Sequence, residues 1–191
     1  MGKIRHRHSM PKPLDDQVCP LRMLILGGAR SGKSRYAERL AVESGKPVMV
    51  IATGWAGDAE MADRIARHRE QRRPDWVTVE EPCALAKVLQ THANENRCLI
   101  VDCLTLWLCN LLAQGEESFQ AERAALLDTL PSLPGIICLV SNEVGLGIVP
   151  TGPLSRRFVD EAGWLHQDLA QLCERVVWVA AGLPQLLKNL P

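Results

Sequence analysis

The sequence carries no excess charge of either sign. Its 22 lysine and arginine residues balance 22 aspartate and glutamate residues, so the formal net charge is zero. Because there is no overall positive field, we expect neither nucleic acid nor an anionic membrane surface as a partner, and a small-molecule substrate is the default expectation.

Long apolar runs are also missing. None approaches the roughly 20 residues that cross a bilayer, and the first residues lack the apolar core of a secretory signal, so we expect no membrane span.

Closely paired cysteines are missing as well. The seven cysteines are odd in number, and no two of them stand as C-x-x-C. The nearest three, Cys98, Cys103 and Cys109, have a spacing that matches no usual zinc site. Most of the seven lie among aliphatic residues, where a free thiol behaves as a small apolar side chain. These features predict a reduced, cytoplasmic protein.

The chain contains no internal repeat and no sign of a second domain. Residues 1–21 hold alternating arginine and histidine at 5–8 and three prolines, without any periodicity. We expect this segment to be a flexible N-terminal extension. The remaining residues, 22–191, suit one α/β domain that is long enough to bury a core.

Beyond residue 21, short apolar runs alternate with stretches of helical periodicity. The predicted strands cover 23–26, 48–52, 76–79, 98–101, 136–140 and, as the final one, 176–180. The predicted helices cover 35–44, 58–72, 84–92, 104–112, 117–130 and 154–173. Continuous apolar strands separated by helices predict an α/β fold, with a mostly parallel sheet that has helices on both faces. Ligands of such sheets bind beyond the carboxyl ends of the strands.

The most informative motif follows the first predicted strand. It matches G-x-x-x-x-G-K-[ST], and its residues are Gly27, Gly28, Ala29, Arg30, Ser31, Gly32, Lys33 and Ser34. An apolar strand before the motif and a helix after it form the context of a phosphate-binding loop, or P-loop. Its backbone N–H groups and the helix N-terminus face the anion. We expect Lys33 to reach the β- and γ-phosphates of a nucleoside triphosphate and the Ser34 hydroxyl to bind Mg²⁺.

Two further strand ends carry candidate site residues. Asp102 closes the apolar run 98–101, which is the Walker B arrangement, so we expect it to hold Mg²⁺ directly or through water. The stretch 140–150 contains Glu143 and two glycines at the edge where ligands bind, and we interpret it as a functional loop. The Asn-Lys-x-Asp motif is absent, and no Asp-x-x-Gly switch begins at Asp102. A Ras-like regulatory GTPase is therefore disfavoured.

His68 lies in the predicted helix 58–72 and allows two interpretations. It shares one helix face with Met61 and Ile65, and this spacing alone favours an ordinary core histidine. Five arginines crowd the segment 64–73, which makes it suitable for a second cluster of phosphates. Their charge should keep the imidazole neutral and nucleophilic. The competing interpretation of these arginines is a solvated helix face.

Taken together, these residues resemble the bifunctional adenosylcobinamide kinase / adenosylcobinamide-phosphate guanylyltransferase family of cobalamin biosynthesis. The resemblance extends from Met23 to about Lys188. The segments that carry it are 27–34, 51–53, 58–61, 64–68, 76–82, 102–107, 110–112, 141–150, 156–158 and 160–163. Where the family often has Gly-Arg-Leu-Asn-Gln, this chain has Gly-Trp-Leu-His-Gln at 163–167.

The resemblance implies a RecA-like P-loop NTPase fold, a homotrimer and two reactions. In the first, ATP or GTP phosphorylates the hydroxyl of the aminopropanol arm of adenosylcobinamide. In the second, a histidine attacks the α-phosphate of GTP, releases pyrophosphate and holds GMP as a phosphoramidate. The phosphate of the first product then accepts the GMP, which gives adenosylcobinamide-GDP. The matching histidine is His68, so the resemblance favours the nucleophile over the core histidine.

The resemblance also implies a set of GTP contacts. Besides the P-loop, they fall on Thr53, Gly54, Trp55, Arg69, Glu70, Gln71, Arg72, Glu80 and Asp102. We expect Trp55 to make its contact through the backbone. As a buried carboxylate, Glu80 would accept hydrogen bonds from the N1–H and N2–H₂ edge of guanine, which adenine lacks. Two alternatives remain: a single-activity P-loop small-molecule kinase in which His68 is structural, and a nucleotide-binding regulatory protein without turnover.

Overall fold

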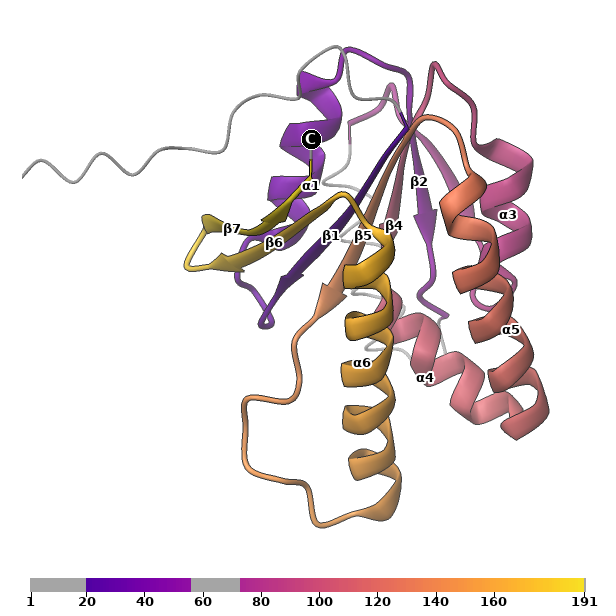
Figure 1. Ribbon diagram of the computed structural model, residues 1–191, viewed down its shortest axis with the longest axis vertical. Coiled ribbons are helices and arrows are strands. Elements are labelled where there is room, and N and C mark those ends of the chain that lie inside the picture. Colours follow the sequence, from indigo (N-terminus) through magenta and orange to yellow (C-terminus); the bar gives the residue numbers. More distant parts are fainter. Residues whose placement is uncertain (1–19, 56–72, 191) are drawn as a thin grey trace, which may run out of the picture.

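A seven-stranded sheet forms the centre of the fold (Figure 1). The computed structural model describes residues 20–55 and 73–190. The strands of the sheet stand in the order β3-β2-β4-β5-β1-β6-β7. They are β1 (Leu21–Gly27), β2 (Val48–Ala52), β3 (Val77–Glu80), β4 (Cys98–Asp102), β5 (Ile136–Asn142), β6 (Arg175–Ala180) and β7 (Leu183–Asn189). The pairs formed among β1 to β6 are parallel, and β7 runs antiparallel to β6.

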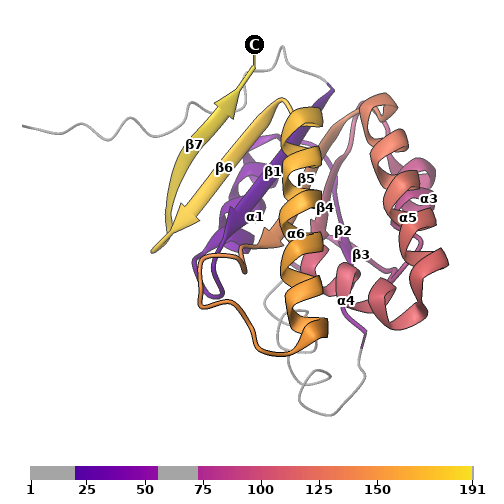
Figure 2. The same ribbon diagram turned by 60° about the horizontal axis from the view of Figure 1, so that its bottom comes forward.

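Helices cover both faces of the sheet, and two apolar clusters show why. Side chains alternate across a strand, so Leu24 and Leu26 join one cluster whereas Met23 and Ile25 join the other. The second cluster packs against α1 (Lys33–Glu43). The helices that pack on the first cluster are α3 (Leu85–His92), α4 (Leu104–Gln114), α5 (Glu116–Thr129) and α6 (Pro153–Leu172), with the short 3₁₀ helix η1 (Leu130–Ser132) after α5 (Figure 2). None of the helices over residues 20–55 and 73–190 has the length and apolarity of a bilayer-spanning segment.

The sheet confirms the predicted α/β class and the approximate positions of the predicted strands. One expectation was wrong: β6 is not the final strand. β7 escapes a search for apolar runs because it is an edge strand, mostly exposed, that contains Pro184. It forms because Ala181 and Gly182 both have positive φ (51° and 78°), which suits a tight hairpin turn after β6. β1 begins at Leu21, inside the expected extension, and the predicted helix 58–72 lies outside the described residues.

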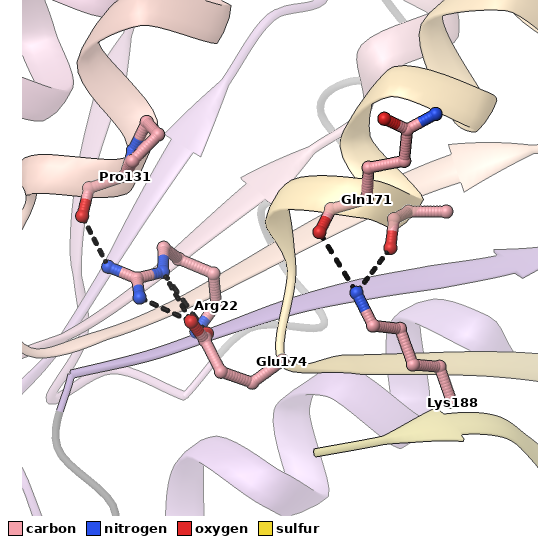
Figure 3. Close-up of polar contacts among 6 residues, drawn as sticks. Arg22, Pro131, Gln171, Glu174 and Lys188 are labelled. Carbon is pink, nitrogen blue, oxygen red and sulfur yellow. Dashed lines mark hydrogen bonds and ion pairs between the residues drawn. The ribbon is translucent and has the colours of Figure 1, made fainter.

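Two polar clusters join distant parts of the chain at the end of the sheet opposite the P-loop (Figure 3). Arg22 of β1 donates its backbone N–H to Glu174 Oε2 at 2.6 Å, and its guanidinium also contacts the Glu174 carboxylate and the Pro131 carbonyl. Lys188 of β7 donates to the carbonyls of Ala170 and Gln171, at 2.7 and 2.9 Å. These carbonyls end α6, so the ammonium caps the helix where its dipole is negative. The late strand β7 therefore stabilises α6 as well as β6.

The Arg22–Glu174 pair predicts an acid-dependent loss of stability. Burial raises the pKa of Glu174, but hydrogen bonds from Arg22 outweigh it, and the pKa lies below its usual value. A carboxyl with a lowered pKa stabilises the fold above its unfolded pKa of 4.5, and this contribution disappears as the pH falls through the folded pKa. We expect Glu174→Gln to lower the free energy of unfolding by roughly 2 kcal/mol at pH 7, measured by urea denaturation. The difference from the parent should shrink below pH 4.5.

Glu43→Gln is the matched control, since Glu43 forms an exposed pair with Arg39 at 3.7 Å. Exposed pairs contribute little, so its effect should stay below about 1 kcal/mol. A Glu174→Gln effect that does not change with pH would show that shape, rather than charge, matters at this position.

Candidate active site

The P-loop connects β1 to α1 in the predicted strand–loop–helix arrangement. Arg30 and Gly32 have positive φ (58° and 96°), which turns the loop back over the end of β1. Gly27 must be glycine, because a Cβ there would lie 2.4 Å from the Val179 carbonyl oxygen and 2.5 Å from Ser31 Oγ. The loop backbone is therefore shaped to surround an anion at the N-terminus of α1.

Lys33 begins α1, and its side chain folds back over the loop. The residue is buried, and Nζ donates to the Gly28 carbonyl at 3.1 Å. Burial, and then the charge of Asp102, raises the pKa of the Cys103 thiol, while Lys33 lowers it. Lys33 and Asp102 thus both lie close enough to Cys103 for their charges to act on its thiol.

Asp102 and Ser34 carry the oxygen atoms of the predicted metal site. Asp102 is half-buried at the carboxyl end of β4, which β5 separates from the P-loop strand. Ser34 is half-buried in the first turn of α1. A carboxylate and a hydroxyl are hard oxygen donors of the kind that Mg²⁺ prefers, so the donor chemistry of these two residues fits that ion.

Thr53 has a task that the sequence did not indicate. It is fully buried, its hydroxyl donates to the Cys103 carbonyl at 2.7 Å, and it accepts the Cys103 N–H at 2.9 Å. Its backbone N–H donates to the Asp102 carbonyl, and its own carbonyl accepts from Asn110 at 2.8 Å. Thr53 therefore joins the ends of β2 and β4 and positions Asp102. A nucleotide contact at Thr53 stays a prediction, and its hydroxyl is already paired.

The same network continues to β5. Thr105 Oγ1 lies 3.0 Å from Cys103 Sγ and accepts from Asn142 Nδ2 at 2.8 Å. Asn142 also stands beside Gly27 in the pairing of β5 with β1. Hydrogen bonds thus connect the ends of β2, β4 and β5 to the start of the P-loop. Thr105 and Asn110 lie in segments that resemble the family, but neither was assigned a role.

Glu80 lies at the carboxyl end of the outermost strand of the sheet, on the side away from the P-loop. It closes β3, the first strand in the sheet order, where it stands beside Ala52 of β2. Four strand spacings of about 4.8 Å place β3 about 19 Å from β1. The expectation of a buried carboxylate was wrong, since Glu80 is exposed on an edge strand. The neighbouring Glu81 turns inward instead, and its Oε1 accepts the N–H groups of Cys83 and Ala84 before α3.

Of the remaining predicted contacts, Gly54 and Trp55 lie within the described residues. Gly54 and Trp55 follow Thr53 at the same sheet edge, and the Trp55 side chain is 70% exposed. The predicted nucleophile and the contacts next to it lie outside the described residues; they are His68, Arg69, Glu70, Gln71 and Arg72.

His166 is a buried histidine that joins α6 to the end of β5. Its Nε2 lies 2.7 Å from Ser141 Oγ, and its Nδ1 lies 3.9 Å from Glu143 Oε2. Burial lowers the pKa of His166, and the charge of Glu143 opposes this shift. Burial therefore favours the neutral form of the imidazole. His166 stands in the stretch 163–167 that departs from the usual family sequence, and a nitrogen engaged by a buried hydroxyl is poorly suited to act as a nucleophile.

The comparison with known proteins agrees with this geometry. Residues 23–187 match the sequence model of the family described as cobinamide kinase / cobinamide phosphate guanyltransferase. The chain belongs to this family. The resemblance stated from the sequence is confirmed, and the P-loop, Asp102 and Glu80 all lie within the matched span.

Two relatives from the cobinamide kinase / guanyltransferase family are similar over nearly their whole length. The bifunctional adenosylcobalamin biosynthesis protein CobP of Pseudomonas aeruginosa is 62% identical over 172 residues, which cover 90% of this chain and 99% of the relative. The bifunctional adenosylcobalamin biosynthesis protein CobU of Escherichia coli K12 is 37% identical over 180 residues, with 87% and 99% covered. Among solved structures, the ATPase EscN of enteropathogenic E. coli is 14% identical, with a TM-score of 0.50. The match covers 84% of this chain and 43% of EscN, and it supports the predicted RecA-like P-loop NTPase fold.

Proposed function

We propose that this chain is a bifunctional enzyme of cobalamin biosynthesis that phosphorylates adenosylcobinamide and then guanylylates the product. The observation that carries the proposal is a complete P-loop on β1 whose lysine shares its surroundings with Asp102, in a chain that matches the family over 23–187. The geometry accounts for nucleotide binding, and membership of the family accounts for the pair of reactions.

In the kinase step, ATP or GTP donates its γ-phosphoryl group. P-loop N–H groups and Lys33 hold the β- and γ-phosphates. Ser34 and Asp102 would hold Mg²⁺, which neutralises phosphate charge when bound. The hydroxyl oxygen of adenosylcobinamide forms a bond to the γ-phosphorus while the bond to the β-phosphate oxygen breaks, so a nucleoside diphosphate leaves.

In the transferase step, His68 is the nucleophile. Its imidazole nitrogen forms a bond to the α-phosphorus of GTP as pyrophosphate leaves, which gives a histidine–GMP phosphoramidate. A phosphate oxygen of adenosylcobinamide phosphate then displaces the histidine and yields adenosylcobinamide-GDP. We assign Arg69, Glu70, Gln71 and Arg72, beside the nucleophile, to GTP contacts, together with the backbone at Thr53, Gly54 and Trp55.

Location and assembly are also part of the proposal. Six cysteines in the described ranges carry free thiols, which supports a reducing, cytoplasmic compartment; they are Cys83, Cys98, Cys103, Cys109, Cys138 and Cys173. The resemblance supports a homotrimer. Light scattering measures its mass directly, and a monomer at working concentration would contradict it.

Labelled GTP tests the proposed function. Protein incubated with GTP that carries the label on the α-phosphate should retain the label in a bond that is stable to base and labile to acid. Adenosylcobinamide phosphate should then remove the label from the protein. Hydroxyl phosphorylation without this adduct would support the single-activity kinase, and binding without chemistry would support a regulatory protein.

Guanine selection gives a prediction for Glu80. Its carboxylate can accept from N1–H and N2–H₂ of guanine, whereas adenine presents a ring acceptor in the matching position. Glu80→Gln keeps the size of the side chain but places an amide donor at this edge. We expect the preference for GTP over ATP in binding and in adduct formation to fall about ten- to a hundredfold, or roughly 1–3 kcal/mol.

Glu81→Gln is the matched control for Glu80→Gln. It makes the same chemical change one residue later, and a glutamine oxygen can still accept from Cys83 and Ala84. It should leave the GTP-to-ATP ratio unchanged. If Glu80→Gln also leaves the ratio unchanged, base choice lies elsewhere, with the backbone near Gly54 as the next candidate.

A further inference from the structure

Glu143 stands where the P-loop begins. It follows β5, the strand between the P-loop strand β1 and the Asp102 strand β4. Its backbone N–H donates to the Gly27 carbonyl at 3.0 Å. The segment after β5 and the loop after β1 therefore lie side by side at one sheet edge (Figure 2). Any group that reacts at the γ-phosphate must approach this edge.

The Glu143 side chain is held by one hydrogen bond, lies near His166 and still reaches the surface. Oε1 accepts the Gly145 N–H at 2.5 Å, and Oε2 faces His166 Nδ1 across 3.9 Å. The side chain is 21% exposed, so a substrate can reach it. Strand ends in the described ranges carry three other carboxylates, and Glu81 already accepts the N–H groups of Cys83 and Ala84 at the end of β3. Asp102 is suited to the metal, and Glu80 lies about 19 Å from β1 by strand spacing.

His166 lies between this carboxylate and the buried Ser141 hydroxyl. The imidazole tautomer that accepts the Ser141 hydroxyl at Nε2 carries its proton on Nδ1, where it faces Glu143. Serine, histidine and glutamate in this order resemble a hydrolase triad. Ser141, however, is completely buried, so no substrate can reach its hydroxyl. The arrangement therefore acts on the glutamate.

We propose that Glu143 is the general base of the kinase step and that His166 is a positioning residue for it. The inference rests on the proposed function. As the adenosylcobinamide oxygen bonds to the γ-phosphorus, its proton passes to a Glu143 carboxylate oxygen. The bond between the γ-phosphorus and the β-phosphate oxygen breaks, and the diphosphate leaves with that electron pair. The carboxyl group then returns its proton to water.

The transferase step gives Glu143 no comparable task. Its acceptor is a phosphate oxygen that is already ionised at neutral pH, so no proton has to leave as the new bond forms. The loss of the base should therefore separate the two activities. A general base typically contributes a factor of about 10²–10⁴ to the rate.

The test is Glu143→Gln, which keeps the size of the side chain and an oxygen that can accept from Gly145. The kinase assay supplies adenosylcobinamide and γ-labelled ATP. The transferase assay supplies adenosylcobinamide phosphate and α-labelled GTP. We expect the kinase kcat to fall about 10²-fold or more, with KM for ATP and the transferase rate close to the parent values. Glu81→Gln, a half-buried strand-end carboxylate that also binds backbone N–H groups, should leave both activities unchanged.

The same two assays can also contradict the inference. If Glu143→Gln keeps the parent kinase rate, or lowers both activities equally, Glu143 is not the base. Since the transferase assay measures the same folded protein, misfolding cannot imitate a selective kinase loss. A parent protein that yields neither product would instead refute the proposed function.

His166 is tested through its partner. His166→Leu removes the Nδ1 proton and should lower the kinase kcat while sparing the transferase. His166→Asn keeps an N–H donor and should restore most of the kinase rate. In a Glu143→Gln background, His166→Leu should have little further effect, because the two residues act as a unit. Additive losses in the double variant would show that His166 does not act through Glu143.

Discussion

Replacing Lys33 with alanine is expected to abolish both activities together, each by a factor on the order of 10² or more. The physical reason is that, in the proposed mechanism, the buried Lys33 ammonium faces the phosphates in both reactions. In the kinase step it offsets charge on the diphosphate that leaves, and in the transferase step it offsets charge on pyrophosphate. The measurement is the rate of adenosylcobinamide phosphorylation and, separately, the yield of protein-bound GMP from labelled GTP.

Lys46→Ala is the matched control for Lys33→Ala. Lys46 also donates to a backbone carbonyl, that of Glu95 at 2.9 Å, but it lies beyond the end of α1 and far in the fold from Gly28. Its loss should leave both rates near the parent values. Should Lys33→Ala keep either activity at the parent rate, the two steps must use different nucleotide positions. The distance of about 19 Å between the strands of Glu80 and the P-loop makes that outcome informative.

The sequence was sufficient for the six parallel strands and for the P-loop because both depend on local signals. Strands such as β2 and β4 are buried on both faces, so they appear as continuous apolar runs whatever their neighbours are. The glycines at 27 and 32 meet local backbone requirements, a close approach and a positive φ, that any such loop imposes. The fold class and the end of the sheet that carries the site followed from these features.

The rest depends on contacts between residues distant in sequence. β7 forms because β6 and a tight turn align it, and its exposed leucines give no alternation that predicts an edge strand. The role of Thr53 depends on its hydrogen bonds with Cys103, a residue 50 positions later. Glu80 is exposed because its strand lies at an edge of the sheet. His166 acquires a role only when α6 packs beside β5. A single sequence gives no signal for such pairs.

His68→Ala is expected to remove the GMP adduct and, with it, adenosylcobinamide-GDP. The imidazole is the proposed nucleophile, and alanine offers no atom that can form the phosphoramidate. Phosphorylation of the substrate hydroxyl should persist. Its rate should fall only as far as His68 contributes to the surroundings of the phosphates. The measurement is acid-labile label on the protein after incubation with α-labelled GTP, beside a kinase assay on the same sample.

His166→Asn is the matched control for the nucleophile, because it removes the histidine that lies beside the candidate site at the end of β5. His166 is buried, and its Nε2 lies 2.7 Å from Ser141 Oγ, so we expect the variant to form the adduct at the parent yield. A His68→Ala protein that still forms the adduct at the parent yield would refute the assignment. The nucleophile would then have to be another side chain, and loss of the adduct in His166→Asn would identify His166 despite its burial.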